Sequence, residues 1–401
     1  MPRPSIHRSP DAAPDAQAID PQRDRLRVAY TYELPAEDIN VQSARPYSTL
    51  QQLRRRASVT LLSPLDDWTR YLFGPKYLWY RATGRIYRPD REALLLAQYG
   101  QQLRRWLANQ KVDCLYSPGT RAVAALGGDL PLVLCADATF ANMVDTYDTF
   151  TNCAAAYIRQ GHRQEKRALD RCAAIIYPSS WAAESAMSAY RVAPDKVHIV
   201  PFGANVDAPD TLAVQRMINE RDTRTFRVLF IGRDWERKGA PLVLDACRTA
   251  LGAGVPLRLD MVGIGTPPVT LPDFATSHGM LRKNNPGQLE RFRGLLAQAH
   301  VLFVPSRAEA YGMTFCEAAA YGVPSLATAV GGIPAVVRND RTGFSLPPEA
   351  DAAAYAAVLR DLHHDRARWR ALAMCARRDY EANFTWDRFG ERLIDIMRQV
   401  V

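Results

Sequence analysis

The sequence lacks an uninterrupted apolar stretch long enough to span a bilayer, so we expect no transmembrane helix. Its seven cysteines are odd in number and scattered, and no Cys-x-x-Cys motif pairs with another. This excludes a disulfide framework and a cysteine-based zinc site, and it favours a reduced, cytoplasmic compartment. Residues 1–24, rich in Pro, Ala and Asp, lack an apolar segment and predict a flexible N-terminal tail.

A strong excess of charge of one sign is also missing. The formal net charge is +9, of which residues 1–205 carry +6, from 26 Lys and Arg against 20 Asp and Glu. Because the excess is mild and no nucleic-acid motif is present, we predict no nucleic-acid partner. The 401 residues, 47% hydrophobic and 23% charged, are typical of a globular protein with two domains.

Short strands alternate with helices along the chain, which predicts the α/β class with doubly wound, mostly parallel sheets. The expected strands lie at 25–30, 59–62, 114–116, 132–135, 173–177, 197–200, 227–231, 257–262, 301–304 and 324–328, and the expected helices at 46–56, 91–110, 181–190 and 241–251. Residues 203–225 break this pattern and are interpreted as a linker. We therefore predict an N-terminal domain over 25–205 and a second domain over 206–384.

Two glutamates, Glu309 and Glu317, follow the apolar strand 301–304 and precede the helical stretch 318–322, which ends in glycine. They therefore lie at the C-terminal edge of a sheet, where open α/β folds bind ligands. The loop 311–314 between them should present free backbone N–H groups to an anion. The two acids could bind the hydroxyl groups of a ligand while the loop amides bind its phosphate. A sugar nucleotide combines these groups, so the pattern predicts a site for one. The alternative is two solvated glutamates around an ordinary helix start.

A second charged segment, 232–239, follows the strand 227–231 and precedes a helix, so its side chains fall at the same sheet edge. Arg233 and Lys238 there could compensate the charge of a diphosphate. The alternative is a solvated charged turn. Downstream, the glycines of 331–337 indicate a turn where the backbone comes close to a neighbour.

The stretch 304–343 resembles the C-terminal signature of retaining GT-B glycosyltransferases of family four. It contains two glutamates separated by seven residues, then Gly-Val-Pro at 322–324 and Gly-Gly-Ile-Pro at 331–334. The similarity extends over roughly residues 130 to 400 and is faint before them. It implies the GT-B fold, in which two Rossmann-like domains face each other across a cleft. It also implies that the last helix, 385–401, crosses back to the first domain.

The resemblance implies a role for each matching residue. Arg233 and Lys238 would clamp the donor pyrophosphate, Glu317 would accept hydrogen bonds from the ribose, and Glu309 would lie beside the transferred sugar as a catalytic acid. The remaining donor-binding residues would act through their backbones or line the base: Gly232, Met280, Leu281, Tyr311, Gly312, Met313 and Thr314. No role is assigned to Arg237.

The implied reaction is transfer of a sugar from a nucleotide-diphosphate sugar to a hydroxyl acceptor with retention of configuration. The sequence has no Asp-x-Asp motif, so we expect the cations to replace a metal ion and no cofactor to be required. The acceptor could be a cell-surface glycan, a glycolipid or a small metabolite. The alternative is a non-catalytic GT-B protein that binds a nucleotide sugar or a partner. A Rossmann oxidoreductase using 262–265 is disfavoured, because the third glycine and the later acid are missing.

The first domain departs from the family. The loop after its first strand, 32–40, has no glycine, whereas many relatives have a glycine-rich loop there. The strand 132–135 is followed by Asp137 where the family often has a histidine nearby. Asp137 is interpreted either as a contact to sugar or acceptor or as a helix cap.

Residues 68–91 interleave aromatic side chains with arginines and a lysine. That pattern suits peripheral contact with the inner face of the membrane, where a lipid-linked acceptor could be met. It equally suits a helix that buries its aromatics and exposes its arginines.

Overall fold

Two parallel six-stranded sheets form the framework of the chain, and the structure, a computed structural model, describes residues 25–144 and 146–401. The predicted flexible tail 1–24 lies outside the described residues. The first sheet has the order β2-β1-β3-β4-β5-β6. Its strands are β1 (Arg27–Thr31), β2 (Ser58–Leu62), β3 (Cys114–Ser117), β4 (Leu132–Cys135), β5 (Ala174–Tyr177) and β6 (Val197–Ile199).

The second sheet repeats the arrangement in the order β12-β11-β10-β7-β8-β9. Its strands are β7 (Phe226–Ile231), β8 (Leu257–Val262), β9 (Ala275–Ser277), β10 (Val301–Val304), β11 (Ser325–Thr328) and β12 (Gly343–Leu346). Every pairing in both sheets is parallel, with Phe226 opposite Leu257 in β7 and β8 and Val301 opposite Val228 in β10 and β7. The predicted doubly wound α/β class is therefore confirmed.

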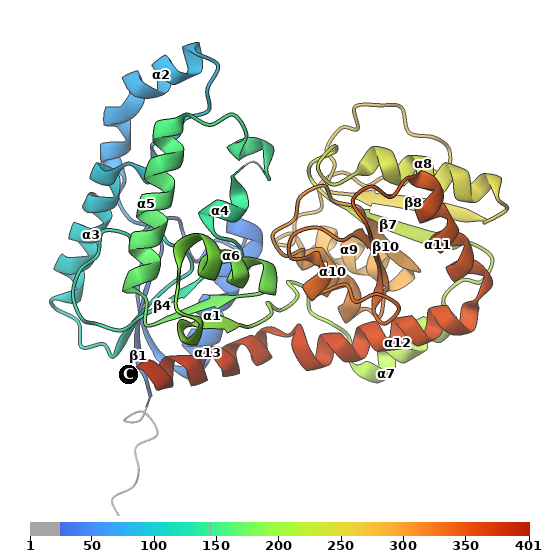
Figure 1. Cartoon of the computed structure of the whole chain (residues 1–401). Helices are drawn as coiled ribbons and strands as arrows, with labels where there is room; N and C mark the ends of the chain where they lie inside the picture. Colours follow the sequence, from blue (N-terminus) through green and yellow to red (C-terminus); the bar gives the residue numbers. More distant parts are fainter. Residues whose placement is uncertain (1–24, 145) are drawn as a thin grey trace, which may run out of the picture.

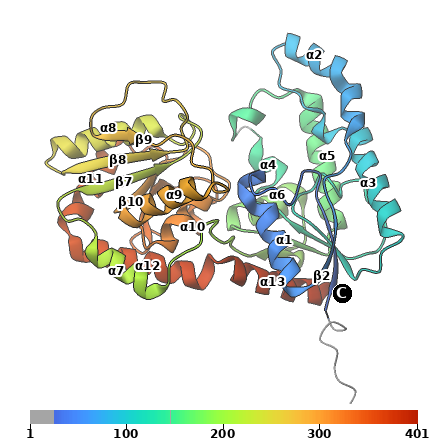
Figure 2. The ribbon, with the colours of Figure 1, turned by 180° about the vertical axis from the view of Figure 1, so that it is seen from behind.

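Helices cover both faces of each sheet, as parallel sheets require. The first set is α1 (Arg45–Arg56), α2 (Gly74–Ala82), α3 (Ala93–Leu107), α4 (Phe140–Met143), α5 (Ala155–Arg171) and α6 (Ser180–Tyr190). The second is α7 (Thr211–Glu220), α8 (Ala240–Gly252), α9 (Pro286–Gln298), α10 (Met313–Ala320), α11 (Ala352–His364), α12 (Arg366–Asn383) and α13 (Trp386–Val400). Figure 1 and the reverse view in Figure 2 show two separate lobes joined along their lower side.

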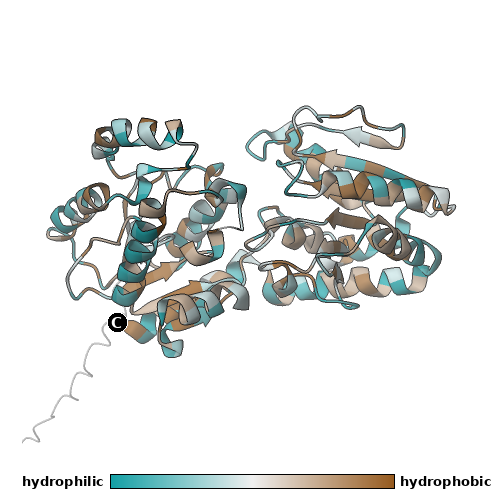
Figure 3. Cartoon of the chain, turned by 45° about the horizontal axis from the view of Figure 1, so that its top comes forward, coloured by the Kyte–Doolittle hydropathy of each residue, from teal (hydrophilic) through white to brown (hydrophobic). Residues whose placement is uncertain are grey.

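The interior of each lobe consists of strands without a polar face. Every residue of β3, β4, β5, β10 and β11 is buried, which explains why their sequences are continuous apolar runs rather than alternating patterns. Figure 3 shows these strands as hydrophobic ribbons enclosed by helices of mixed character. Within the described residues no helix is both long and apolar enough to cross a membrane.

Each sheet reverses its strand order at one point, and these points position the site. In the first sheet β1 lies between β2 and β3; in the second, β7 lies between β8 and β10. Loops leaving the two central strands at such a point diverge to opposite sides and leave a crevice at the carboxyl edge. The loops after β7 and β10 carry the predicted donor-site residues, and those after β1 and β3 belong to the facing lobe.

The two lobes are joined where the linker meets the start of α13. The Ala204 amide donates to Phe384 O at 2.9 Å, and the ring of Phe202 stacks on Trp386 with centroids 5.9 Å apart. Asn205 Oδ1 accepts hydrogen bonds from Ser48 Oγ at 3.1 Å and Trp386 Nε1 at 2.8 Å. One side chain thus connects the first lobe, the linker and the final helix.

α13 continues from α12 beneath the second lobe to the first lobe, where it packs against α1 (Figure 1). Its buried face includes Phe389, Leu393 and Met397, all fully buried. The final helix therefore supplies part of the first lobe's apolar packing, although it follows the second lobe in sequence. The domain boundaries at 205 and 384 stay predictions.

The segment predicted to be an irregular linker, 203–225, contains a helix. α7 begins at the Asp210 cap, whose carboxylate accepts from the Ala213 amide at 2.7 Å, and it packs against α12. The helix was not predicted, although Val214 and Ile218 are buried and Met217 packs beside them. These three positions follow the i, i+3, i+4 spacing of a helix, so the sequence carries a short helical signal here.

Replacing Gly203 with alanine should destabilise the junction between the lobes. A Cβ at this position would lie 2.2 Å from the Trp386 backbone nitrogen, so the start of α13 must move. We expect a loss of about 1–3 kcal/mol in the free energy of unfolding, measured by urea titration. Gly127→Ala is the control, because no atom lies within 4 Å of its added Cβ. Equal stability of the two variants would contradict this packing.

Candidate functional site

A cavity of about 310 Å³ opens at the carboxyl edge of the second sheet, between the two lobes. Its walls come from the loops after β7, β8 and β10, from the start of α10, and from the loop after β1 of the first lobe. The predicted residues that line it are Gly232, Arg233, Lys238, Met280, Leu281, Glu309, Met313, Thr314 and Glu317. The structure therefore brings together predicted residues from four segments of the second lobe: the loops after β7, β9 and β10 and the first two turns of α10.

Glu309 lies on the loop after β10 and forms an ion pair with Lys238 from the loop after β7. Both side chains are largely buried, with 14% and 11% of their surface exposed. Ser306 Oγ also lies 3.5 Å from the Glu309 carboxylate. Because burial makes an uncompensated charge costly, the ion pair fixes the two loops against each other across the switch point. The acid and the cation predicted to work at the reacting centre are direct neighbours.

Glu317 occupies the second turn of α10 and forms an ion pair with Lys283. Its side chain is only 3% exposed, whereas that of Lys283 is 28% exposed. The Lys283 ammonium also lies 5.0 Å from the centre of the Phe292 ring. The carboxylate is thus held at the floor of the cavity by a cation that has access to solvent.

A glycine turn fixes the backbone of Glu309. Gly331 has φ +56°, and an added Cβ would lie 1.9 Å from the Glu309 carbonyl oxygen. The next amide, of Gly332, donates to that same oxygen at 3.1 Å. The close approach predicted for the glycines after β11 is therefore an approach to the backbone of the acid itself.

The cavity carries a net positive charge. Its lining includes five cationic side chains and two acids, a net charge of +3. The cations are Arg233, Arg237, Lys238, Arg282 and Lys283. In the part of the chain that the structure describes, Arg233 has no hydrogen bond or ion pair, so its guanidinium is free to bind an anion. Within the same residues, no three His, Cys, Asp or Glu side chains group as metal ligands.

The glycine-free loop of the first lobe continues through residues 41–44, and this longer loop also reaches the cavity. It contributes Ile39, Asn40, Ser43 and Ala44. Gln42, Ser43 and Ala44 adopt left-handed backbone angles, with φ of 45°, 54° and 63°. Such angles cost about 1–3 kcal/mol for each residue other than glycine. The loop therefore takes a conformation suited to glycine without containing one. Hydrogen bonds from Arg45 to Gln42, at 2.6 Å, and from Asn205 to Ser43 O help to hold it.

Three predicted residues lie elsewhere than in the cavity lining. The Tyr311 side chain is buried, and its hydroxyl donates to Phe202 O of the linker at 3.2 Å, so only its backbone could serve a donor. Gly312 precedes α10 with a left-handed φ of 92°. Asp137 lies in the first lobe, 4.0 Å from Arg45, with its side chain 49% exposed. It does not cap α4, because Thr139 does so by accepting from the Asn142 amide at 3.1 Å.

Sequence reasoning missed three residues of the site. Arg237 donates to Ala308 O at 2.9 Å and lies 4.0 Å from Glu309, so it holds the loop that carries this acid. Lys283 was missed as the partner of Glu317. The ring of Tyr147, from the first lobe, lies 5.5 Å from the Arg237 guanidinium. Burial, with smaller effects of Glu309 and Asp137, raises the pKa of Tyr147 above its usual range.

Two family models match this architecture in sequence. The description Glycosyltransferase Family 4 matches residues 46–208, and Glycosyl transferases group 1 matches residues 214–381. The chain belongs to the family 4, group 1 glycosyltransferases. The glycosyltransferase family predicted from residues 304–343 is therefore confirmed, and the match begins at residue 46, in the part before residue 130 where the resemblance was faint.

Relatives of this glycosyltransferase include D-inositol 3-phosphate glycosyltransferase 1 of Catenulispora acidiphila, 31% identical over 57% of each chain. D-inositol 3-phosphate glycosyltransferase of Streptomyces avermitilis is 32% identical over 59% of this chain and 53% of its own. The chain spans a little over half the length of these relatives.

Solved structures share the fold of this glycosyltransferase. Sucrose-phosphate synthase from Thermosynechococcus elongatus matches 94% of this chain and 99% of its own with a TM-score of 0.67 and 19% identity. HepE from Anabaena in complex with UDP matches 93% of this chain and 100% of its own with a TM-score of 0.64 and 15% identity. These likenesses confirm the GT-B fold, with two Rossmann-like domains.

Replacing Lys283 with alanine should destabilise the protein by about 3 kcal/mol, because it leaves the buried Glu317 carboxylate unpaired. The double variant Lys283→Ala, Glu317→Ala should recover part of that loss. Urea unfolding of the wild type, of both single variants and of the double variant measures the coupling.

Lys166→Ala is the matched control, since its ion pair with Asp170 is about half exposed on both sides. It should lose less than about 1 kcal/mol. A Lys283→Ala variant as stable as this control would contradict the compensating role of Lys283.

Proposed function

We propose that the protein transfers a sugar from a nucleotide-diphosphate sugar to a hydroxyl acceptor, with retention of configuration and without a metal ion. The observation that carries the proposal is the convergence of Glu309, Glu317, Arg233 and Lys238 on one cavity at the switch point of the second sheet. A cavity of net charge +3 suits a diphosphate, and buried acids suit hydroxyl groups.

The donor would lie across this cavity. Glu317, deep in α10, would accept hydrogen bonds from the ribose, with Met280 and Leu281 beside the base. Arg233 and Lys238 would bind the diphosphate, together with backbone amides at the start of α10. Glu309 would lie against the sugar, where its charge favours the positive charge that develops as the glycosidic bond breaks.

In the proposed step the bond between the anomeric carbon and the phosphate oxygen breaks, and the acceptor hydroxyl bonds to the same face of that carbon. The acceptor proton passes to the leaving phosphate oxygen. The growing charge on that phosphate would be met by Arg233 and Lys238, the role that a divalent ion would otherwise fill. The relatives named for D-inositol 3-phosphate glycosyl transfer and the HepE complex with UDP support this class of chemistry.

A thermal-shift panel of UDP, GDP, ADP and dTDP sugars, with and without EDTA, tests the proposal. A donor at 100 times its dissociation constant should stabilise the fold by about 2.7 kcal/mol. The stabilising donor is then used for turnover, and the anomeric configuration of the product is read by NMR. Loss of turnover with EDTA would refute metal independence. A product of inverted anomeric configuration would refute retention. No shift with any donor would favour the non-catalytic alternative.

Glu309→Gln should lower kcat by about 10²–10³-fold while changing the affinity for the free nucleotide little, because its proposed partner is the sugar. Glu236→Gln is the control, since that side chain is 61% exposed on the loop after β7. Turnover is measured with the donor found in the panel, and nucleotide affinity by calorimetry. An equal loss of nucleotide binding would show that Glu309 contacts the nucleotide instead.

The aromatic arm, residues 68–82, supports a further part of the proposal, contact with the inner face of the membrane. α2 buries none of its residues, and Trp68, Tyr71, Leu72, Leu78 and Trp79 each expose more than half of their surface. This exposure supports membrane contact over a helix that buries its aromatics. In Figures 1 and 2, α2 projects from the end of the first lobe farthest from α13.

The charge beside the arm favours an anionic lipid surface over a protein partner of mixed charge. Arg85 and Arg88 donate to neutral oxygens, those of Asn152 and Thr149, so their charges are not compensated by an acid. Arg81, in the last turn of α2, has no ion-pair partner among the residues described. Tryptophan, tyrosine and arginine together are typical of the membrane interface.

The double variant Leu78→Ser, Trp79→Ser should reduce binding to anionic vesicles by about tenfold or more, because each side chain would bury apolar surface in the interface. Flotation with phosphatidylglycerol vesicles and with phosphatidylcholine vesicles at low salt measures this. Leu212→Ser, on the second lobe with 66% of the leucine exposed, is the control. Absence of wild-type binding to anionic vesicles would refute the contact.

A further inference from the structure

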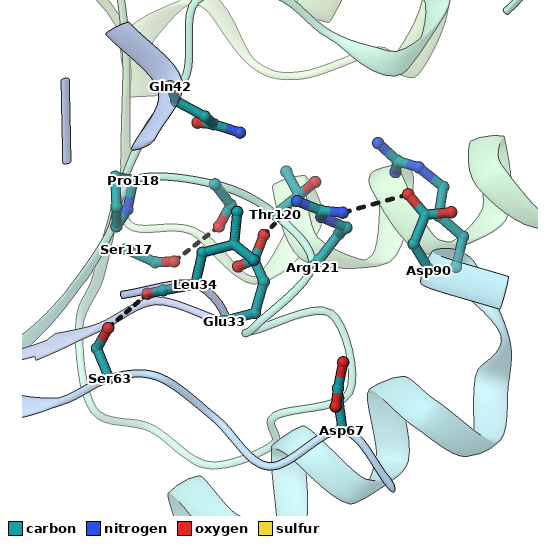
Figure 4. Close-up of polar contacts among 12 residues, drawn as sticks. Glu33, Leu34, Gln42, Ser63, Asp67, Asp90, Ser117, Pro118, Thr120 and Arg121 are labelled. Atoms are coloured by element: carbon teal, nitrogen blue, oxygen red, sulfur yellow. Dashed lines mark hydrogen bonds and ion pairs between the residues drawn. The ribbon is translucent and has the colours of Figure 1, made fainter. Parts of the chain in front are cut away.

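The switch point of the first sheet carries a charged cluster in the loops that follow its two central strands. Glu33 follows β1 and Arg121 follows β3, and their side chains form an ion pair at 2.6 Å. Arg121 also forms an ion pair with Asp90 at 3.2 Å. Figure 4 shows the three side chains in one row, with Asp67 on the neighbouring loop. By position, the cluster is the first-lobe counterpart of the Glu309 loop.

Two carboxylate oxygens of this cluster have no protein partner. Glu33 is 7% exposed, and its Oε2 atom is buried without a hydrogen bond in the described part of the chain. The same holds for Oδ1 of Asp90 and for the hydroxyl of Tyr32, a residue that is 1% exposed. An unsatisfied buried polar atom costs about 1–3 kcal/mol, more when it is charged. Such atoms in one cluster indicate groups that a ligand completes.

The cluster is continuous with the predicted reacting centre. Arg45 lies 4.0 Å from Asp137 and donates to Pro118 O and to Gln42 Oε1. Figure 4 shows Pro118 and Gln42 in the same group of residues as Glu33 and Arg121. Burial, reinforced by Glu33, raises the pKa of Tyr32 above its usual range, so the hydroxyl stays protonated. Tyr147 of the first lobe lies 5.5 Å from the Arg237 guanidinium, which in turn lies 4.0 Å from Glu309.

The cations of this region are already occupied. Arg121 Nη2 and Nη1 bind Glu33 and Asp90. Arg45 is buried and directs Nη1 to Pro118 O at 2.8 Å and Cys135 O at 3.1 Å, and Nη2 to Gln42 Oε1 at 2.6 Å. Three acids, Glu33, Asp90 and Asp137, stand against these two cations. The region therefore offers carboxylate oxygens as hydrogen-bond acceptors, while the guanidiniums of Arg45 and Arg121 are engaged by the protein.

We propose that Glu33, with Asp90 and Asp137, forms an acceptor subsite for a polyhydroxylated ligand that carries no phosphate beside its reacting hydroxyl. The proposal rests on the proposed function and names the chemistry of its acceptor. Hydroxyl groups donate to Glu33 Oε2 and Asp90 Oδ1, the atoms that the protein leaves unpaired. A phosphate at this place meets carboxylates and finds both guanidiniums engaged, which disfavours it.

Matched pairs of probes that differ by one phosphate test this subsite. Binding of myo-inositol and of D-inositol 3-phosphate, and of glucose and glucose 6-phosphate, is measured by saturation-transfer NMR with UDP present. We expect the unphosphorylated member of each pair to bind about tenfold or more tightly. Glu33→Gln should weaken polyol binding and reduce the discrimination against phosphate. Tighter or equal binding of the phosphorylated members, or no binding of any polyol, would overturn the proposal.

Glu37→Gln is the control, because Glu37 lies on the same loop but is 60% exposed and pairs with Arg54 at the surface. If Glu33→Gln does not fold, Asp137→Asn gives the same readout, since Asp137 is half exposed. If the folded variant still prefers the unphosphorylated ligand to the same degree, the role of the acid that it replaces is refuted. UDP binding is followed in the same samples. Absence of UDP binding to the wild type would refute the proposed function. Intact UDP binding together with tighter binding of the phosphorylated ligands would refute the subsite alone.

Discussion

The second lobe depends on the compensation of two buried carboxylates. Glu309 and Glu317 come from one loop and one helix, and each is paired with a lysine from a different segment. Because a buried charge without a partner is far less stable than a paired one, the loop after β7 and the segment around Lys283 are held in place by the acids. The cavity's walls are therefore defined by charge as much as by apolar packing.

The same principle explains why the facing lobe differs. There the acids Glu33 and Asp90 share one guanidinium and retain unpaired oxygens, so compensation is incomplete. The second lobe presents cations to its ligand and the first presents acceptors. The proposed nucleotide-diphosphate donor and polyol acceptor would each meet groups of the charge that suits it.

Much of the framework could be predicted from the sequence, because parallel strands buried on both faces leave continuous apolar runs such as Leu132–Cys135. Glu309 and Glu317 could be placed because the strand, loop and helix around them are local in sequence. The partners could not, since the Lys283–Glu317 pair depends on how distant loops pack. α7 was missed because its apolar face is short, formed by Val214, Met217 and Ile218. Exposure of the aromatics on α2 could not be deduced, because the same pattern suits a buried helix.

The position of α13 has a consequence for how the chain acquires its structure during synthesis. α13 closes the apolar face of α1, and Asn205 bonds both Ser48 and Trp386, so the first lobe lacks part of its packing until α13 leaves the ribosome. At about 5–20 residues per second, α13 is complete about 10–40 s after the last strand of the first sheet. The face of α1 that receives Phe389 and Leu393 is then the surface through which a nascent chain would meet a chaperone or aggregate.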